Sequence, residues 1–231
     1  MALWSPMSAR QQKSYDQLCP LAMALDHVGD RWSLLVIREL LGGPARFNDL
    51  GRALPGIASN LLSNRLRRLE DSGIVERRIV FGSSAYAVTE LGAGLRPVLE
   101  ALGSWGMRIG PLPTSEPSPV RSARSAAMGL EAVLQHGQGP DEELIIDLLV
   151  DTEHLTVTIG GDRPATVRAG LPGRSHALIA TTLNVLATLP LNGLPQGALS
   201  AARGDRSARL ALERAIMTAL DAMESLVDEG C

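Results

Sequence analysis

The chain has 231 residues, of which 45% are hydrophobic and 20% are charged, so it is long enough to bury one large core or two smaller ones. Its first 12 residues lack the apolar segment of a signal peptide, and no stretch approaches the roughly 18 apolar residues of a membrane helix. The two cysteines, Cys19 and Cys231, argue against a disulfide framework. We therefore expect a globular cytoplasmic protein that does not insert into membranes.

The charge is divided unevenly along the chain. Residues 1–110 contain 13 lysines and arginines against 10 acids, a balance of +3, whereas residues 111–231 contain 9 against 15, a balance of −6. Two halves of a chain whose net charges have opposite signs are expected to bind different partners. Because the basic excess is small, contacts with phosphate groups would have to come from local clusters of arginine.

Residues 1–17 are polar and have no clear period, which predicts an N-terminal arm with little fixed structure. The apolar residues that follow Pro20 recur at i, i+4 and i+7, and these are Leu21, Leu25 and Val28. This spacing predicts a short helix that opens at Pro20 and ends at Gly29.

Asp30 is suited to cap a helix over residues 32–41, which is apolar on most sides and is therefore expected to be the central buried helix. A Gly-Gly-Pro sequence stops this helix, and a shorter helix is expected near residues 47–54. A Leu-Pro-Gly turn then leads into another helical pattern. Two short helices at this separation predict a helix-turn-helix.

The stretch from Ser59 to Arg78, SNLLSNRLRRLEDSGIVERR, has the pattern of the second helix of such a motif. Its buried face is marked at i, i+4 and i+7 by Leu62, Leu66 and Leu69. Its outward face carries Asn60, Ser63, Asn64 and Arg67. Asn and Arg can make paired hydrogen bonds to adenine and guanine edges. Taken alone, this helix fits a DNA-recognition helix and an ordinary amphipathic surface helix equally well.

After residue 73 the apolar period changes to two, and a Gly-Ser-Ser turn at residues 82–84 separates two short β-prone runs. A hairpin directly after a recognition helix, with Arg77 and Arg78 on its first strand, is the order of a winged helix. Thr89 is suited to cap a last helix over about residues 90–107. The apolar residues of this helix outnumber what a small domain needs to cover, so we expect it to form a dimer contact with a second copy of the chain.

Several short motifs over about residues 18–108 together resemble the HxlR-type winged helix-turn-helix regulators. They are Cys19–Pro20, Gly29–Asp30–Arg31–Trp32, Arg46–Phe47–Asn48–Asp49–Leu50, Gly56–Ile57, Leu62–Ser63, Arg65–Leu66, Leu69–Glu70, Gly73, Tyr86 and Thr89–Glu90–Leu91–Gly92. The resemblance implies a winged helix-turn-helix domain over residues 18–110. Members of that family are bacterial transcription factors that bind double-stranded DNA as homodimers, with one recognition helix per subunit in successive major grooves of a palindromic site.

The resemblance also assigns roles to single residues. It places the recognition-helix contacts with DNA at Ser59, Asn60, Ser63, Asn64 and Arg67. It places Arg77, Arg78 and Ser83 near phosphates beside the wing. Many members have Ser or Thr where this chain has Ala58, so the helix is expected to start at Ser59. Some members sense oxidants through a cysteine at the place of Cys19, for which a small packing residue is the simpler interpretation.

Residues 111–125 are rich in proline and serine and predict an extended linker. A second domain is then expected over residues 126–231, with helices near residues 128–135 and 208–227. Strands are expected near residues 144–150, 155–159, 165–169 and 198–202, residues 175–182 fit strand or helix, and an apolar run over 184–189 is closed by Pro190. The order predicts an α+β domain with a small curved antiparallel sheet and helices over one face.

This second pattern resembles the sterol-carrier-protein-like fold. That fold often encloses an apolar tunnel, so the resemblance implies an effector-binding or dimerisation domain and a hydrophobic small molecule as a candidate effector. The candidate cavity residues are Leu148, Val150, Leu183, Leu186 and Leu189. A filled core is the simpler interpretation of the same residues.

No arrangement typical of an enzyme is found. The four histidines lack the spacing of metal ligands, and the chain contains no P-loop and no Gly-x-Ser-x-Gly motif. We therefore expect a DNA-binding regulator that is not an enzyme and needs no metal or cofactor. The alternative is a lipid-binding or other hydrophobic-ligand-binding protein whose N-terminal domain mainly dimerises.

Overall fold

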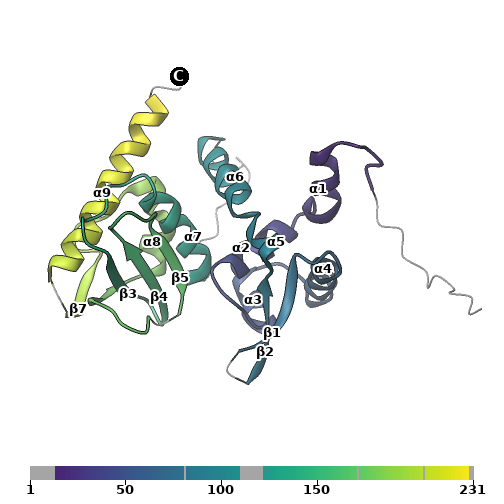
Figure 1. The fold of residues 1–231 in the computed structure, drawn as a ribbon, viewed down its shortest axis with the longest axis horizontal. Coiled ribbons are helices and arrows are strands. Elements are labelled where there is room, and N and C mark those ends of the chain that lie inside the picture. Colours follow the sequence, from purple (N-terminus) through teal and green to yellow (C-terminus); the bar gives the residue numbers. More distant parts are fainter. Residues whose placement is uncertain (1–13, 81, 110–121, 171, 205, 229–231) are drawn as a thin grey trace, which may run out of the picture.

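The computed structural model describes residues 14–80, 82–109, 122–170, 172–204 and 206–228. The chain forms an N-terminal lobe, residues 14–109, and a C-terminal lobe, residues 122–228, which lie side by side (Figure 1). The first lobe holds a two-stranded hairpin among helices, and the second holds a five-stranded sheet. Each lobe has its own cluster of buried apolar side chains. The structure confirms the mixed α+β class, with a helix-turn-helix lobe followed by a sheet lobe.

The N-terminal lobe is organised around the helix predicted to be buried. Its elements are α1 (Pro20–Val28), α2 (Ser33–Leu41), α3 (Phe47–Ala53), α4 (Ser59–Asp71), β1 (Val75–Val80), β2 (Ser83–Val88), α5 (Glu90–Ala93) and α6 (Arg96–Ile109). Val36 and Ile37 of α2 are fully buried among side chains from α3, α4 and the wing. Asp30 accepts hydrogen bonds from the backbone N–H groups of Trp32, at 2.9 Å, and Ser33, at 3.1 Å. It therefore binds the turn that leads into α2, although the helix starts at Ser33 with Trp32 at the cap position, one residue later than predicted.

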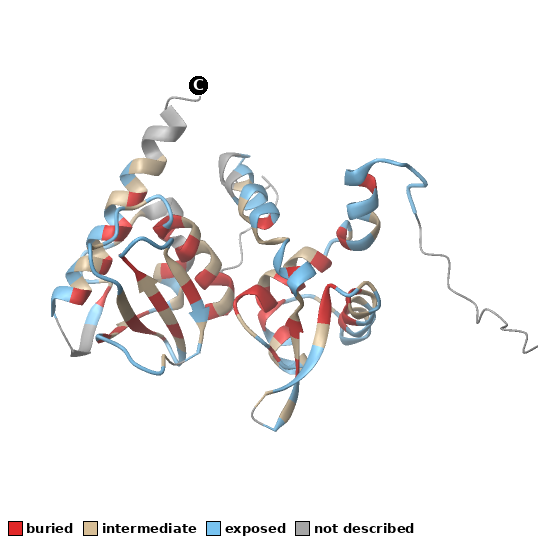
Figure 2. Cartoon of the chain, in the orientation of Figure 1, coloured by how far each residue is buried: buried red, intermediate tan, exposed pale blue. Residues whose placement is uncertain are grey.

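α1 has the predicted bounds, but most of its predicted apolar face is open. Val28 is buried, whereas Leu21 is 67% exposed and Leu25 is 37% exposed. Figure 2 shows the same imbalance, with α1 and α6 mostly exposed while red buried segments gather in α2 and in the sheet. The spacing of leucines therefore predicted the helix correctly and the burial of its face only in part.

The helix predicted over residues 90–107 is two helices, α5 and α6. Thr89 caps α5 by accepting a hydrogen bond from the N–H of Gly92 at 3.1 Å. The break follows from Pro97, which lacks the N–H needed to continue the helix and would clash with the preceding turn. Gly92 packs so closely that an added Cβ would lie 2.2 Å from the carbonyl oxygen of Ile74. The prediction missed this break because it followed the apolar period through the proline.

The wing hairpin is tighter than predicted. β2 begins at Ser83, which pairs with Val80, so Ser83 and Ser84 belong to the strand and not to the turn. Gly82 has a φ of +71°, the left-handed conformation that two-residue hairpin loops require. Phe81 lies outside the described residues.

The C-terminal lobe is a mixed sheet with helices over one face. Its elements are α7 (Ala123–Leu134), β3 (Leu144–Val150), β4 (Glu153–Ile159), β5 (Thr166–Ala169), β6 (Ala177–Thr181), α8 (Leu183–Asn192), β7 (Ser200–Gly204) and α9 (Arg206–Asp228). The strand order is β5-β4-β3-β6-β7. The prediction of a purely antiparallel sheet is wrong, because the β4–β5 hairpin occupies one edge of β3 and β6 pairs with the other edge in parallel.

One face of this sheet carries the core. Ile146 and Leu148 of β3 are fully buried and share a cluster with Leu130 of α7, Leu186 of α8 and Leu212 of α9. The segment that fitted strand or helix is the strand β6. The helix α8 continues through Pro190 to Asn192 and does not stop at the proline.

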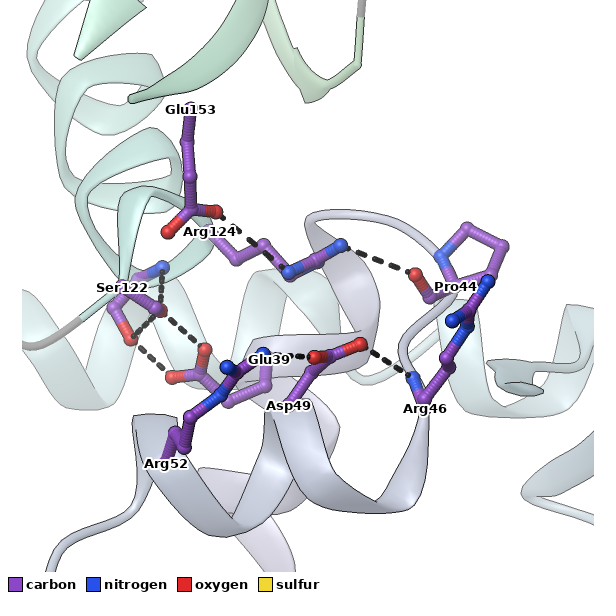
Figure 3. A network of polar contacts seen from close by, with 9 residues as sticks. Glu39, Pro44, Arg46, Asp49, Arg52, Ser122, Arg124 and Glu153 are labelled. Atoms are coloured by element: carbon purple, nitrogen blue, oxygen red, sulfur yellow. Dashed lines mark hydrogen bonds and ion pairs between the residues drawn. The ribbon is translucent and has the colours of Figure 1, made fainter. Parts of the chain in front are cut away.

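The predicted linker ends earlier than expected, and α7 joins the two lobes. Residues 110–121 lie outside the described residues, but Ser122 and Ser125 are buried at the start of α7. The buried carboxylate of Glu39 in α2 accepts hydrogen bonds from Ser122 Oγ, at 2.5 Å, and from Ser125 Oγ (Figure 3). A carboxylate at a helix N-terminus is also favoured by the helix dipole.

The backbones of the two lobes also approach closely beside this contact. The N–H of Ala169 in β5 donates to the carbonyl oxygen of Gly42 at 2.8 Å. Arg124 of α7 donates to the carbonyl oxygen of Pro44 at 3.3 Å (Figure 3). An added Cβ on Gly42 would lie 2.9 Å from the Cβ of Arg124, so this approach needs glycine.

Candidate nucleic-acid interface

The helix α4 presents the predicted polar face to solvent. Leu62, Leu66 and Leu69 are at most 1% exposed and hold the opposite face in the core. The outward residues are exposed, and they are Ser59, Asn60, Ser63, Asn64 and Arg67. Among the described residues, Arg67 has no carboxylate within ion-pair distance. The face therefore offers amide, hydroxyl and guanidinium groups that are free to meet a ligand.

The entry of α4 follows the prediction made from Ala58. The helix starts at Ser59, and Ala58 occupies the cap position without a side-chain hydrogen bond to the first turn. The amide groups of this turn consequently lack the side-chain acceptor that a serine or threonine cap provides. Such amides are suited to meet a phosphate group.

An ion pair links α4 to the N-terminus of α2. Arg65 Nε lies 3.0 Å from Asp30 Oδ1, and both side chains are about four-fifths buried. Asp30 thus contacts the N-terminus of α2 and also holds α4, so it fixes α4 against the buried central helix of the lobe. The prediction for Asp30 included the contact with the start of α2 but not the ion pair with Arg65.

The wing arginine Arg77 is already bound within the lobe. Its Nε lies 2.9 Å from Glu70 Oε1, at the end of α4, and its guanidinium lies 5.2 Å from the ring centroid of Tyr86 in β2. The hydrogen bond to Glu70, with further contributions from Tyr86 and the Glu70 charge, raises the pKa of Arg77. The same contact occupies the guanidinium, so a phosphate would have to compete with Glu70 for it.

The other predicted wing residues are placed differently. Arg78 Nη2 lies 2.5 Å from Glu76 Oε1, and both side chains are well exposed, so this pair is weak and easily exchanged for another anion. Ser83 is half-buried at the start of β2. The structure joins α4 and the wing through Glu70 and Arg77, and it leaves Arg78 as the more available cation of the hairpin.

A second exposed surface lies on α6. Beyond Leu99, which is buried, the helix exposes Leu102, Trp105 and Ile109, and Val98 is also exposed. Trp105 is 56% exposed. Large apolar side chains gathered on one projecting helix mark a protein–protein contact more often than a free surface. This is the helix for which the apolar excess predicted a dimer contact.

The remaining candidates are the two cysteines, the predicted cavity residues of the C-terminal lobe and any metal-binding group. Cys19 is exposed and occupies the cap position of α1, and Cys231 lies outside the described residues. Leu148, Val150, Leu186 and Leu189 are buried in the core of the C-terminal lobe, and Leu183 packs against it. Within the described part of the chain, no group of three or more His, Cys, Asp or Glu side chains is placed to hold a metal ion.

A pocket of about 580 Å³ does lie in the C-terminal lobe, but away from those leucines. It is formed where α7 ends, along the β4–β5 turn and against Ala215 of α9. The polar side chains on its wall are Gln135, Asp162 and Arg163.

No described helix has the length and apolarity needed to cross a bilayer.

The sequence motifs do not include the residues that connect the lobes, chiefly Glu39, Glu131 and Arg96. Glu39 is 0% exposed and Glu131 is 3% exposed. A sequence signal was present, because each acid interrupts a helix that is otherwise apolar or alanine-rich on that face. Buried acids are rare unless they are paired, so such positions predict a partner without identifying it.

Comparison with known proteins agrees with this geometry. Residues 27–112 match the model of the HxlR-like helix-turn-helix family. An uncharacterized HTH-type transcriptional regulator of Methanothermobacter thermautotrophicus is 35% identical over 98 residues, which are 41% of this chain and 75% of the relative. Two Bacillus subtilis regulators are similar: YkvN is 37% identical over 38% of this chain and 77% of its own length, and YodB is 34% identical over 38% and 82%.

Proposed function

This chain belongs to the HxlR-like helix-turn-helix family of DNA-binding transcriptional regulators, and we propose that it acts as a homodimer on a palindromic operator. The exposed polar face of α4 carries the proposal. Its Asn60, Asn64 and Arg67 side chains read base edges in the major groove, and Ser59 and Ser63 contact the bases or backbone nearby. Arg78, with Arg77 and Ser83, binds phosphates beside the wing.

The dimer is supported by α6 and α1. Both helices expose apolar side chains that the lobe itself does not cover, including Trp105 and Leu21. A twofold dimer presents two recognition helices to successive major grooves, which is why the proposed operator is palindromic. Sedimentation equilibrium of the full chain tests this part, since a monomer at micromolar concentration contradicts it.

A competition mobility-shift titration tests the DNA-binding part. The purified chain is titrated onto labelled DNA from its own promoter region in the presence of excess random DNA. Preferred retention of the promoter fragment, with an affinity that falls steeply as salt rises, is the expected result. Equal competition by random DNA contradicts a specific operator.

For the C-terminal lobe we propose a sterol-carrier-like fold that binds a hydrophobic effector or stabilises the dimer. The five-stranded sheet with α7, α8 and α9 over one face supports the fold. The candidate cavity remains the region of Leu148, Val150, Leu183, Leu186 and Leu189. Mass spectrometry of denatured protein checks for retained apolar ligand. Equal operator affinity with and without such a ligand contradicts effector control, because a ligand acts only through different affinities for two states.

Cys19 is proposed as a redox-sensing residue, since it is exposed and lies at the N-terminus of α1. The matched test is operator affinity before and after peroxide treatment, in the parent protein and in Cys19→Ser. A peroxide response that persists in Cys19→Ser contradicts the role.

A further inference from the structure

The projecting helix α6 is anchored to the rest of the molecule near its first turn. Its first residue is Arg96, and Leu99 is its contribution to the buried cluster of the N-terminal lobe. Farther along, Leu102, Trp105 and Ile109 are exposed, and Figure 1 shows the helix extending away from the lobe. The direction of α6 therefore depends on the contacts of this first turn.

Arg96 makes polar contacts with both lobes. Its Nη1 lies 2.7 Å from Glu131 Oε2, and its Nη2 donates to the carbonyl oxygen of Leu41, the last residue of α2, at 3.1 Å. The Arg96 side chain is 20% exposed and that of Glu131 is 3% exposed. Charged hydrogen bonds that are largely removed from water are strong, and loss of one partner leaves a buried charge without compensation.

Glu131 belongs to the other lobe and serves a second cation there. Arg168 of β5 places its Nη1 2.8 Å from Glu131 Oε2 and 2.9 Å from Oε1. One buried carboxylate on α7 is thus shared between the first residue of α6 and the edge strand of the sheet. A displacement of β5 or α7 therefore moves the Glu131 carboxylate, which holds Arg96 at the start of α6.

We propose that Glu131 is a positioning residue through which the C-terminal lobe sets the direction of α6. In the dimer of the proposed function, on which this consequence rests, the direction of α6 determines the separation of the two recognition helices. The 14 residues of α6 span about 21 Å, so a rotation of about 10° at the anchor moves the far end by about 4 Å. A shift of that size is enough to change the fit to two half-sites.

The first test measures how strongly Glu131 stabilises α6, and it requires neither DNA nor dimerisation. Hydrogen exchange is followed in the full chain with Glu131→Gln, which keeps the size of the side chain and removes its charge. We expect exchange at least about tenfold faster in α6, with α4 unchanged. The matched control is Glu213→Gln in α9, whose carboxylate pairs with Arg209 within the C-terminal lobe. Unchanged exchange in α6 of Glu131→Gln overturns the proposal.

A second, more conservative variant distinguishes loss of the Arg96–Glu131 contact from a general loss of folding. Arg96→Lys keeps the charge beside Glu131 but cannot bind Glu131 and the Leu41 carbonyl with a planar fork. We expect exchange in α6 between the rates of the parent protein and Glu131→Gln. Equal acceleration throughout both lobes would show a structural role only and contradict positioning.

The second test measures the distance between the two α4 helices of a dimer. Spin labels are attached at Asp71→Cys, at the exposed end of α4, in a background with Cys19→Ser and Cys231→Ser. Dipolar spectroscopy then gives the distance between the two labels of a dimer, which we expect to shift or broaden in Glu131→Gln but not in Glu213→Gln. An unchanged distance overturns the proposal. A parent protein with no dipolar signal contradicts the dimer itself, and the exchange experiment still decides whether Glu131 anchors α6.

Discussion

Arg77 Nε lies 2.9 Å from Glu70 Oε1, so the first strand of the wing is tied to the last turn of α4 in the free protein. The pair lies at the surface, with Arg77 62% exposed and Glu70 23% exposed. Arg77 can therefore meet a DNA phosphate only in competition with a neighbouring carboxylate. This competition makes the contribution of Arg77 to DNA binding measurable.

Glu70→Gln is predicted to strengthen DNA binding. The substitution removes the competing charge and a negative group close to the phosphates, so the affinity for any DNA sequence should rise, by at most about fivefold. Fluorescence anisotropy at several salt concentrations measures it. Glu90→Gln, an exposed acid on α5, is the control. A loss of affinity in Glu70→Gln would show instead that Glu70 mainly holds the wing in place.

Asn64→Ala and Arg67→Ala are predicted to relax sequence preference. Each removes a candidate base contact, at a cost of about 1–3 kcal/mol for the preferred base at one operator position. Affinities for single-base variants of the operator measure the effect. Arg214→Ala, an exposed arginine of α9, should leave every affinity unchanged. A uniform loss across all variants would assign these residues to the phosphate backbone.

Trp105→Glu is predicted to dissociate the dimer. A charge on the exposed apolar face of α6 opposes burial of that face against a second copy, so the dimer dissociation constant should rise at least about tenfold. Sedimentation equilibrium measures it, with Leu210→Glu on the exposed side of α9 as the control. An unchanged constant would place the dimer contact elsewhere.

Gly42→Val is predicted to destabilise the junction of the lobes. Its Cβ would meet Arg124, so the variant should lose about 1–3 kcal/mol of unfolding free energy. Gly129→Ala in α7, where an added Cβ meets nothing within 4 Å, should gain up to about 1 kcal/mol. Urea denaturation compares the two. Equal stability of Gly42→Val and the parent protein would mean that the lobes are free to separate.

The periodic elements could be predicted from sequence because one face of each is buried. The leucines of α4 at positions 62, 66 and 69 and the continuous apolar run of β3 mark those faces. β3 has the predicted bounds, and α4 begins at the predicted residue, Ser59. The exposed candidate residues of α4 follow from the same period. Local chemistry also predicted the contact of Asp30 with the N-terminus of α2, and the resemblance to the family predicted the start of α4 after Ala58.

Contacts between distant segments could not be predicted, since a single sequence does not show which residues meet. Glu131 binds Arg96 and Arg168, which stand 35 and 37 positions away on opposite sides in the chain. The parallel pairing of β6 with β3 depends on which edge the β4–β5 hairpin leaves open. The pairing of Arg77 with Glu70 likewise depends on the path of the wing past α4.

Selection from random-sequence DNA by the purified full chain is the decisive measurement of DNA recognition by α4. We expect enrichment of a twofold-symmetric motif whose half-sites lie about 10 base pairs, or a multiple of that, apart. We also expect Asn64→Ala and Arg67→Ala to lose the enrichment at particular positions of each half-site. Recovery of no common motif by a folded, dimeric protein would contradict the assignment of α4 as a recognition helix.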